Sequence, residues 1–390
     1  MPQYTRAIVI VLDGVGVGAL PDAGAYGDAG SDTLGHVARR VALRLPALRS
    51  LGLDRIATLG TGPSSHWVGA AGKMAEASAG KDSVTGHWEM MGVVLKAPFP
   101  VFPDGFPAAV IEAFARQTGR SVIGNRVASG TRILHDRGAE HLRTGALIVY
   151  TSADSVFQVA AHEDIVPLAE LYDACEVAFR LVCRGLGVGR VIARPFVGSP
   201  GDFRRTANRR DFVLPPVGET FLDRALAASL PVVAIGKIQD LFAGRGMSRA
   251  LHTASDAEGM DRLREQMAEV TGGFLFVNLV DFDTQYGHRN DVQGYAQNLE
   301  QFDRRLAELL MSLHDDDLLV VTADHGNDPT TPSTDHSREY VPLLVAGSRV
   351  KAGTDLGIRR TFADVGQTLA ENFGVGLLAN GTSFLSDIRA

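Results

Sequence analysis

Short apolar runs rich in β-branched residues recur along the chain, and longer amphipathic segments separate most of them. The runs have the length of strands, whereas residues 294–314 have apolar positions at helical spacing. We expect strands at residues 7–13, 146–154, 190–196, 231–237, 274–283, 318–326 and 341–347. This alternation is typical of an α/β protein in which helices cover both faces of a mostly parallel sheet.

Two Pro-rich stretches mark places where the chain changes character. The first is KAPFPVFPDGFP at residues 96–107, and the second is FVLPPVGET at residues 212–220. Stretches of this kind are common at domain boundaries. We therefore expect a discontinuous core domain made of residues 1–96 and 217–390, and a smaller inserted α/β domain made of residues 97–216.

Composition and charge exclude several classes of protein. With 390 residues, 45% of them hydrophobic and 21% charged, the chain is long enough for two folded domains. The net charge is −7 and no Lys/Arg run reaches five residues, so we expect no nucleic-acid partner. The N-terminal apolar run has only six residues and ends at an acid, which fits neither a secretory signal nor a membrane span. We expect a cytoplasmic protein without an obligate protein partner.

The two cysteines suggest no redox chemistry. Cys175 and Cys183 are eight residues apart on a helix-like segment, so that both side chains would lie on its inner face. Buried thiols are therefore a better interpretation than a disulfide.

Acidic residues stand at the ends of three of the strongest expected strands. In open α/β sheets, ligands bind beyond the carboxyl ends of the strands. A single aspartate there is about as often a helix cap or a turn residue, but here histidines follow close behind. The candidate ligands are Asp13, Asp283, Asp324, His288, His325 and His336, and Asp281 is a further strand-end acid.

Three carboxylates and three imidazoles suit two divalent ions, each with three protein ligands and open positions for a substrate. The alternative is that His288 and His336, taken singly, are solvated loop residues. Paired metals with such ligands most often serve phosphoryl or related ester transfer, which requires a nucleophile. The segment 78–92, SAGKDSVTGHWEMMG, offers Ser83 and Thr85 just before a helix-like run, although either hydroxyl could simply cap that helix.

The glycine-rich stretch DGVGVGAL at residues 13–20 does not fit a dinucleotide-binding site. It lacks the G-x-G-x-x-G spacing, and no acid ends a second strand at the usual distance. We expect these glycines to let a backbone turn pass close to the metal site.

Four segments resemble the motifs of the phosphopentomutase family, within the alkaline phosphatase superfamily. They are DGVGVGALPDAGAYGDAGSDTLGH (13–36), GKDSVTGHWEMMG (80–92), VDFDTQYGHRND (280–291) and TADHGNDPTTPSTDHSREYVPLLV (322–345), and the resemblance extends to the closing NGTSFL. It implies an alkaline-phosphatase-like core with an inserted cap domain that binds a sugar phosphate. The implied reaction converts α-D-ribose 1-phosphate, or its 2-deoxy form, to the 5-phosphate through a phosphothreonine enzyme and a bisphosphate intermediate.

The resemblance also implies roles for particular residues. Thr85 would carry the phosphoryl group. One metal would be held by Asp13, Asp324 and His325, and the other by Asp283, His288 and His336. The metals are most often manganese in this family, and a sugar bisphosphate acts as activator. The pentose phosphate would be bound by Asp154, Arg194, Arg209 and Lys237, with Arg210 competing for the role of Arg209.

Other functions remain open from the sequence. A phosphatase or sulfatase, in which water accepts the transferred group, would use the same metal ligands. A metal-dependent phosphoglycerate mutase would share the fold, but we would expect a serine nucleophile and a different cap. A protein that only binds sugar phosphate or metal is a third alternative, and each substrate-binding candidate could instead be a surface charge.

Overall fold

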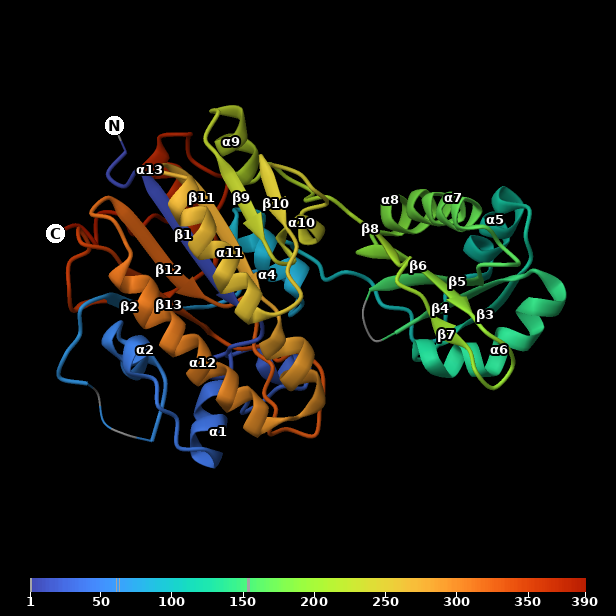
Figure 1. The fold of residues 1–390 in the computed structure, drawn as a ribbon, viewed down its shortest axis with the longest axis horizontal. Coiled ribbons are helices and arrows are strands. Elements are labelled where there is room, and N and C mark those ends of the chain that lie inside the picture. Colours follow the sequence, from blue (N-terminus) through green and yellow to red (C-terminus); the bar gives the residue numbers. More distant parts are fainter. Residues whose placement is uncertain (1, 61, 63, 153–154) are drawn as a thin grey trace. The chain divides into compact units, whose positions relative to one another are not determined.

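The computed structural model describes residues 2–60, 62, 64–152 and 155–390. Their contacts divide the chain into two compact units, drawn in Figure 1. Unit 1 comprises residues 1–97 and 216–390, and unit 2 comprises residues 98–215. All seven expected strand segments contain a strand.

Unit 1 is built on a mixed sheet with the strand order β10-β9-β11-β1-β12-β13-β2-β14. β13 runs antiparallel to both of its neighbours, β12 and β2, and the other pairs are parallel. The expected mostly parallel sheet is thus confirmed. Its strands are β1 (Arg6–Leu12), β2 (Ala70–Met74), β9 (Val232–Ile235), β10 (Arg249–Leu251), β11 (Gly273–Leu279), β12 (Asp317–Thr322), β13 (Val341–Ala346) and β14 (Thr354–Arg359).

The central strands explain why the sheet needs helices on both faces. Every residue of β1, β11, β12 and β13 is buried, so neither face of this part of the sheet meets solvent. Figure 1 shows α11 and α12 crossing in front of the sheet, and α13 packs against α4 and α9. The helices of unit 1 are α1 (Thr33–Arg40), α2 (Pro46–Ser50), α3 (Leu53–Ile56), α4 (Ser83–Met90), α9 (Phe221–Ala227), α10 (Ile238–Leu241), α11 (Asp256–Glu269), α12 (Val292–Met311) and α13 (Ala363–Phe373).

Unit 2 is a smaller α/β fold with its own apolar core. Its sheet has the order β3-β4-β5-β6-β7, and β8 pairs with β6. The strands are β3 (Val122–Val127), β4 (Leu147–Thr151), β5 (Val156–His162), β6 (Arg190–Val197), β7 (Arg204–Arg205) and β8 (Arg210–Val213). The helices are α5 (Ala108–Thr118), α6 (Gly130–Thr144), α7 (Leu168–Ala178) and α8 (Arg184–Leu186), with a π-helical turn at Phe179–Cys183.

The cysteines lie in the core of unit 2. Cys175 is on α7 and Cys183 ends the π-helical turn, and both are free and buried. Burial raises the pKa of both thiols, that of Cys183 to about 12. The expectation of two buried thiols is therefore confirmed.

No helix among the described residues is long and apolar enough to cross a membrane.

The expected helix at residues 294–314 is α12, which begins two residues earlier and ends at Met311. It begins with a side-chain cap from Asp291, which accepts a hydrogen bond from the Gly294 N–H at 2.9 Å.

Candidate active site

Three adjacent parallel strands deliver acidic residues to one edge of the unit 1 sheet. β1 lies between β11 and β12, so the carboxyl ends of these strands are neighbours. Asp13 follows β1 directly, Asp324 comes just after β12, and Asp283 lies in a π-helical turn, Phe282–Tyr286, beyond β11. All three carboxylates are at most 2% exposed. Buried charges so close together require a positive counterpart.

The first cluster that could hold a metal ion is formed by Asp13, Asp324 and His325, whose ligand atoms all lie within 4.8 Å of one another. His325 Nε2 is 3.3 Å from Asp13 Oδ1 and 3.4 Å from Asp324 Oδ2. Its Nδ1 lies 3.0 Å from the Gly326 carbonyl oxygen and donates to it. That hydrogen bond leaves Nε2 as the ring nitrogen that faces the carboxylates, the arrangement found in metal-bound imidazoles.

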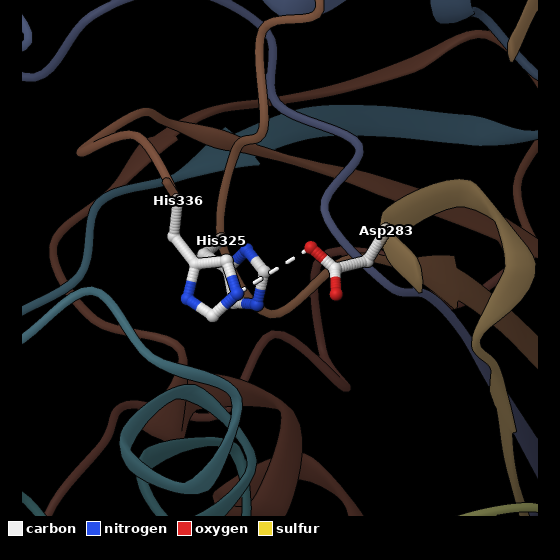
Figure 2. A group of neighbouring side chains, drawn as sticks. All are labelled: Asp283, His325 and His336. Carbon is white, nitrogen blue, oxygen red and sulfur yellow. Dashed lines mark ion pairs between the residues drawn. The ribbon is translucent and has the colours of Figure 1, made fainter. Parts of the chain in front are cut away.

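The second cluster is formed by Asp283, His325 and His336. Figure 2 shows the two imidazole rings overlapping in the view, with the Asp283 carboxylate beside them and joined to His336 by a dashed line. Their centroids are 3.9 Å apart, and His336 Nε2 lies 3.4 Å from Asp283 Oδ1. His288 is outside both clusters, and its side chain is 39% exposed, but its Nε2 lies 3.1 Å from Asp283 Oδ2. The Nδ1 atom of His288 is 2.6 Å from the Thr334 carbonyl oxygen. Neither His288 nor His336 is therefore a freely solvated loop residue.

The ionisable groups in these clusters shift one another's pKa values. Burial alone would raise the pKa of Asp283, but the facing His336 and His288 hold that pKa well below its usual range. The hydrogen bond to Asp283 raises the pKa of His288 to about 9. Burial opposes protonation of His325, yet the Asp324 carboxylate drives its pKa well above the usual value. The site therefore favours positive charge, which divalent cations would supply.

Buried oxygens in this region support the same interpretation. Asn278 Oδ1 and Asn327 Oδ1 have no hydrogen-bond partner among the described residues. Asp324 Oδ2 meets only imidazole nitrogens, those of His87 and His325, at 3.3 and 3.4 Å. A buried polar oxygen without a hydrogen-bond partner is costly. Oxygen and imidazole donors together suit a hard or borderline divalent ion. The residues present therefore fit the metals expected from the sequence.

Two asparagines hold the carboxylates in place. Asn278 donates through Nδ2 to Asp13 Oδ2 at 3.1 Å, and Asn327 donates through Nδ2 to Asp283 Oδ1 at 2.7 Å. We did not predict either residue from the sequence. Asn278 was detectable in principle, because it is the single polar residue in the buried strand β11. Asn327 lies in a polar loop, where no local pattern distinguishes it.

The other acid at the end of β11 has a different role. Asp281 accepts a hydrogen bond from the Asp256 N–H at 2.8 Å, and its own N–H donates to Asp256 Oδ1 at 2.9 Å. This reciprocal pair joins the start of α11 to the chain just before Asp283. Asp281 belongs to neither metal cluster among the described residues.

The candidate nucleophiles lie in the first turn of α4. Asp82 caps this helix and accepts the Thr85 N–H at 3.1 Å and the Thr85 hydroxyl at 2.6 Å. The Ser83 hydroxyl instead lies 3.1 Å from His325 Nε2 and 3.5 Å from Asp13 Oδ1. Both side chains are buried beside the positive end of the helix, a favourable place for a phosphoryl group.

Close backbone packing fixes α4 against Asp324, one of the candidate metal ligands. A Cβ atom on Gly86 would lie 2.2 Å from the carbonyl oxygen of Asp324, so only glycine allows this approach. Gly14, with φ at +82°, donates its N–H to Asp324 Oδ1 at 3.1 Å. Its own Cβ would lie 3.1 Å from Asn327 Cβ. The turn after β1 thus passes tightly by the site.

The expected substrate-binding residues are distributed over both units. Lys237 lies in unit 1, two residues after β9, at the same edge of the sheet as the acids. It is half-buried, and its ammonium group forms no hydrogen bond or ion pair within the described part of the chain. Arg194 lies on β6 of unit 2, where its Nε donates to Gln158 Oε1 at 3.1 Å. Asp154 lies outside the described residues.

Arg209 and Arg210 have different surroundings in unit 2. Burial lowers the pKa of Arg194, and the positive charge of Arg209 lowers it further, so these two guanidinium groups are within electrostatic reach of each other. The Arg210 guanidinium instead lies over the rings of Tyr172 and Phe212, at 5.4 and 4.8 Å. The Arg209 guanidinium also pairs with the Asp211 carboxylate, to which its Nε and Nη2 donate at 2.6 Å each.

Comparisons with known proteins connect this geometry with a family. The sequence model of the metalloenzyme superfamily matches residues 5–377. The phosphopentomutase of Caldanaerobacter subterraneus subsp. tengcongensis is 55% identical over 384 residues, which are 98% of each chain. The phosphopentomutases of Acetivibrio thermocellus and Kosmotoga olearia are 53% and 52% identical, and each match covers 98% of this chain and 99% of the relative. The match is thus nearly complete in both directions.

Proposed function

Since the chain belongs to the phosphopentomutase family, within the metalloenzyme superfamily, we propose that it interconverts the 1-phosphate and the 5-phosphate of ribose or 2-deoxyribose. A phosphothreonine at Thr85 would donate its phosphoryl group to the free hydroxyl of the bound sugar phosphate. The resulting bisphosphate would return its other phosphoryl group to Thr85. The observation that carries this proposal is the convergence of six ligand residues and the α4 hydroxyls at one edge of the sheet.

The metals would be held by two sets of residues. Asp13, Asp324 and His325 form one set, and Asp283, His288 and His336 form the other. Bound divalent cations, manganese by resemblance to the family, would neutralise charge that develops on the transferring phosphoryl group. The hydrogen bonds from Asn278 and Asn327 to the carboxylates would keep the ligand atoms oriented.

We infer Thr85 rather than Ser83 as the phosphoryl carrier from the resemblance to the family, and the surroundings of its hydroxyl support this role. Its hydroxyl hydrogen points to Asp82 Oδ2 at 2.6 Å, so a carboxylate is in position to accept the proton when the oxygen attacks. The Ser83 hydroxyl points to the ligand atoms of His325 and Asp13. A metal bound there would engage the same imidazole nitrogen. Ser83 is therefore the alternative nucleophile that an experiment has to exclude.

The rest of the substrate would be held by cationic groups. A mutase must retain the phosphate that does not react, and guanidinium groups bind phosphate through paired hydrogen bonds. In unit 2, Arg194 and Arg209 would provide this binding. In unit 1, the ammonium group of Lys237 would add a further contact, and Asp154 would bind a sugar hydroxyl. A small-molecule pentose phosphate is the expected partner.

A single assay distinguishes this function from hydrolysis. Purified protein with manganese and ribose 5-phosphate is followed for ribose 1-phosphate and free phosphate together, with and without a sugar bisphosphate activator. We expect isomer formation with little release of phosphate. Steady release of phosphate without isomer would instead show a hydrolase of the same superfamily.

Two variants assign the nucleophile. Thr85→Ala should abolish isomerisation, and mass spectrometry after incubation with the bisphosphate should find no phosphorylated residue in it. Ser83→Ala should weaken turnover but still acquire phosphate at Thr85. A Thr85→Ala protein with near wild-type turnover would refute the proposed mechanism.

A further inference from the structure

One buried arginine joins the segment before α4 to the segment that carries a metal ligand. Arg338 comes two residues after His336, and it is 3% exposed. Its Nη1 donates to Glu76 Oε2 at 2.7 Å and to the carbonyl oxygens of Ser78 and Gly80 at 2.8 and 2.5 Å. Its Nη2 donates to the Glu76 carbonyl oxygen at 3.0 Å. One guanidinium group thus binds residues 76–80 at four acceptor atoms.

The same segment is held from its other side by α4 itself. Glu89, on the last turn of that helix, accepts hydrogen bonds from the N–H groups of Ala77 and Ser78 at 2.8 and 2.6 Å. Arg338 therefore holds carbonyl groups of residues 76–80 while Glu89 holds N–H groups. A segment fixed at both kinds of backbone group has little freedom to move.

This segment forms a wall beside the proposed nucleophile. A Cβ atom on Gly80 would lie 2.9 Å from Thr85 Oγ1 and 3.0 Å from Thr85 Cγ2. The Gly80 backbone therefore lies next to the Thr85 side chain, and Arg338 binds the carbonyl oxygen of that very glycine. A shift of Gly80 would change the space available to the hydroxyl.

The backbone of Arg338 is itself anchored near the metal ligands. Its N–H donates to Asp28 Oδ2 at 2.9 Å, and its carbonyl oxygen accepts the Leu20 N–H at 3.0 Å. The preceding residue, Ser337, exchanges two backbone hydrogen bonds with Gly326, at 2.7 and 3.0 Å. Gly326 directly follows the ligand His325. Hydrogen bonds thus hold both the backbone and the guanidinium group of Arg338 in place.

We propose that Arg338 is a positioning residue, which holds the Thr85 hydroxyl in register with the metal ligands His325 and His336. This inference rests on the proposed role of Thr85 as the phosphoryl carrier. Arg338 contacts neither the Thr85 hydroxyl oxygen nor the phosphoryl group that this oxygen would carry, and it acts on Thr85 through the Gly80 backbone. Lysine cannot replace it, because an ammonium group is a point donor and cannot reach four acceptors in one plane.

The chain offers a matched control at the opposite end of the sheet. Arg6, at the start of β1, is fully buried, forms an ion pair with Asp317 and donates to the carbonyl oxygens of Met267 and Val270. It resembles Arg338 in burial and in its mixture of carboxylate and carbonyl acceptors. It lies at the amino end of β1, whereas the site lies at the carboxyl end.

The experiment compares Arg338→Lys with Arg6→Lys as full-length, manganese-loaded proteins. Both substitutions should lower the melting temperature. Arg338→Lys should reduce kcat for isomerisation by about 10- to 100-fold, because a displacement of about 1 Å is sufficient for such a loss. KM for ribose 5-phosphate should change less than about twofold. Single-turnover phosphorylation of Thr85 by the bisphosphate should slow by the same factor as kcat, and Arg6→Lys should keep wild-type rates.

Three outcomes would overturn the inference. Wild-type kcat in Arg338→Lys, with Thr85→Ala inactive, would refute the positioning role and leave the proposed function intact. Equal losses of kcat in both lysine variants would assign Arg338 to stability alone. Full turnover in Thr85→Ala would refute the proposed function, and the role of Arg338 with it.

Discussion

Gly86→Ala tests whether the position of α4 against the metal ligands controls turnover. By helix propensity alone, this substitution should stabilise the helix by about 1 kcal/mol. The new Cβ would, however, lie 2.2 Å from the Asp324 carbonyl oxygen, 2.9 Å from its carbonyl carbon and 3.0 Å from its Cβ. All three atoms belong to the backbone or the Cβ of Asp324, so a rotamer change cannot relieve the contact.

The size of the effect follows from that contact. A carbon and a carbonyl oxygen normally approach to about 3.3 Å, so α4 and the segment around Asp324 must separate by about 1 Å. Overpacking of this kind costs about 1–3 kcal/mol, which should outweigh the gain in helix propensity. The same displacement moves Thr85 relative to the ligands, and we expect kcat to fall by about 100-fold.

Coupled isomerisation assays and thermal unfolding measure the two consequences. Gly185→Ala is the control, since that glycine is also helical and its added Cβ would meet nothing closer than the Arg180 carbonyl oxygen at 3.7 Å. It should keep wild-type kcat. A Gly86→Ala protein with a kcat within about threefold of the wild-type value would show that close packing of α4 on Asp324 does not position the nucleophile.

Three further predictions concern other parts of the protein. Burial raises the pKa of Asp256 to about 7, whereas an unfolded aspartate titrates near 3.9. The wild-type protein should therefore lose up to about 1.4 kcal/mol of unfolding free energy per pH unit as the pH rises between these two values. Denaturant titrations of Asp256→Asn should lack this contribution to the pH dependence. Asn327→Ala frees Asp283 and should weaken manganese binding about 10- to 100-fold by calorimetry; unchanged affinity would contradict the support we assign to the amide. The thiols of Cys175 and Cys183 should react with a thiol reagent only after unfolding, and rapid labelling of native protein would contradict their burial.

Several of the strands that the sequence identified are buried on both faces, although β5 is equally buried and was missed. β1, β11 and β12 are continuous apolar runs, and their interpretation needs no knowledge of their neighbours. β2 and β14 were missed for a physical reason. β2 consists largely of small residues, AAGKM, and β14 is an edge strand with a glycine and mostly exposed side chains. Such segments become strands through their partners rather than through their own pattern.

Candidate ligands were identifiable because strand ends in a parallel sheet meet at one edge. The acids Asp13, Asp283 and Asp324 could be placed together from the order of the elements alone. The positions of the imidazoles could not be predicted in this way, because they depend on loop geometry. His325 faces both groups of carboxylates, and no spacing in the sequence indicates that sharing. Arg338 was also missed, since a lone arginine in a polar loop resembles a surface charge until its acceptors are known.

The central place of β1 has a consequence for synthesis of the protein. Arg6 and its partner Asp317 are 311 residues apart, and β1 pairs only with β11 and β12. At about 5–20 residues per second, a ribosome needs roughly 15–60 s to supply β12 after β1 has been made. Unit 2 is continuous in sequence and is synthesised entirely within that interval. The apolar first strand must meanwhile lack at least one of its two partner strands, which makes the nascent chain, rather than the finished enzyme, the form most exposed to aggregation.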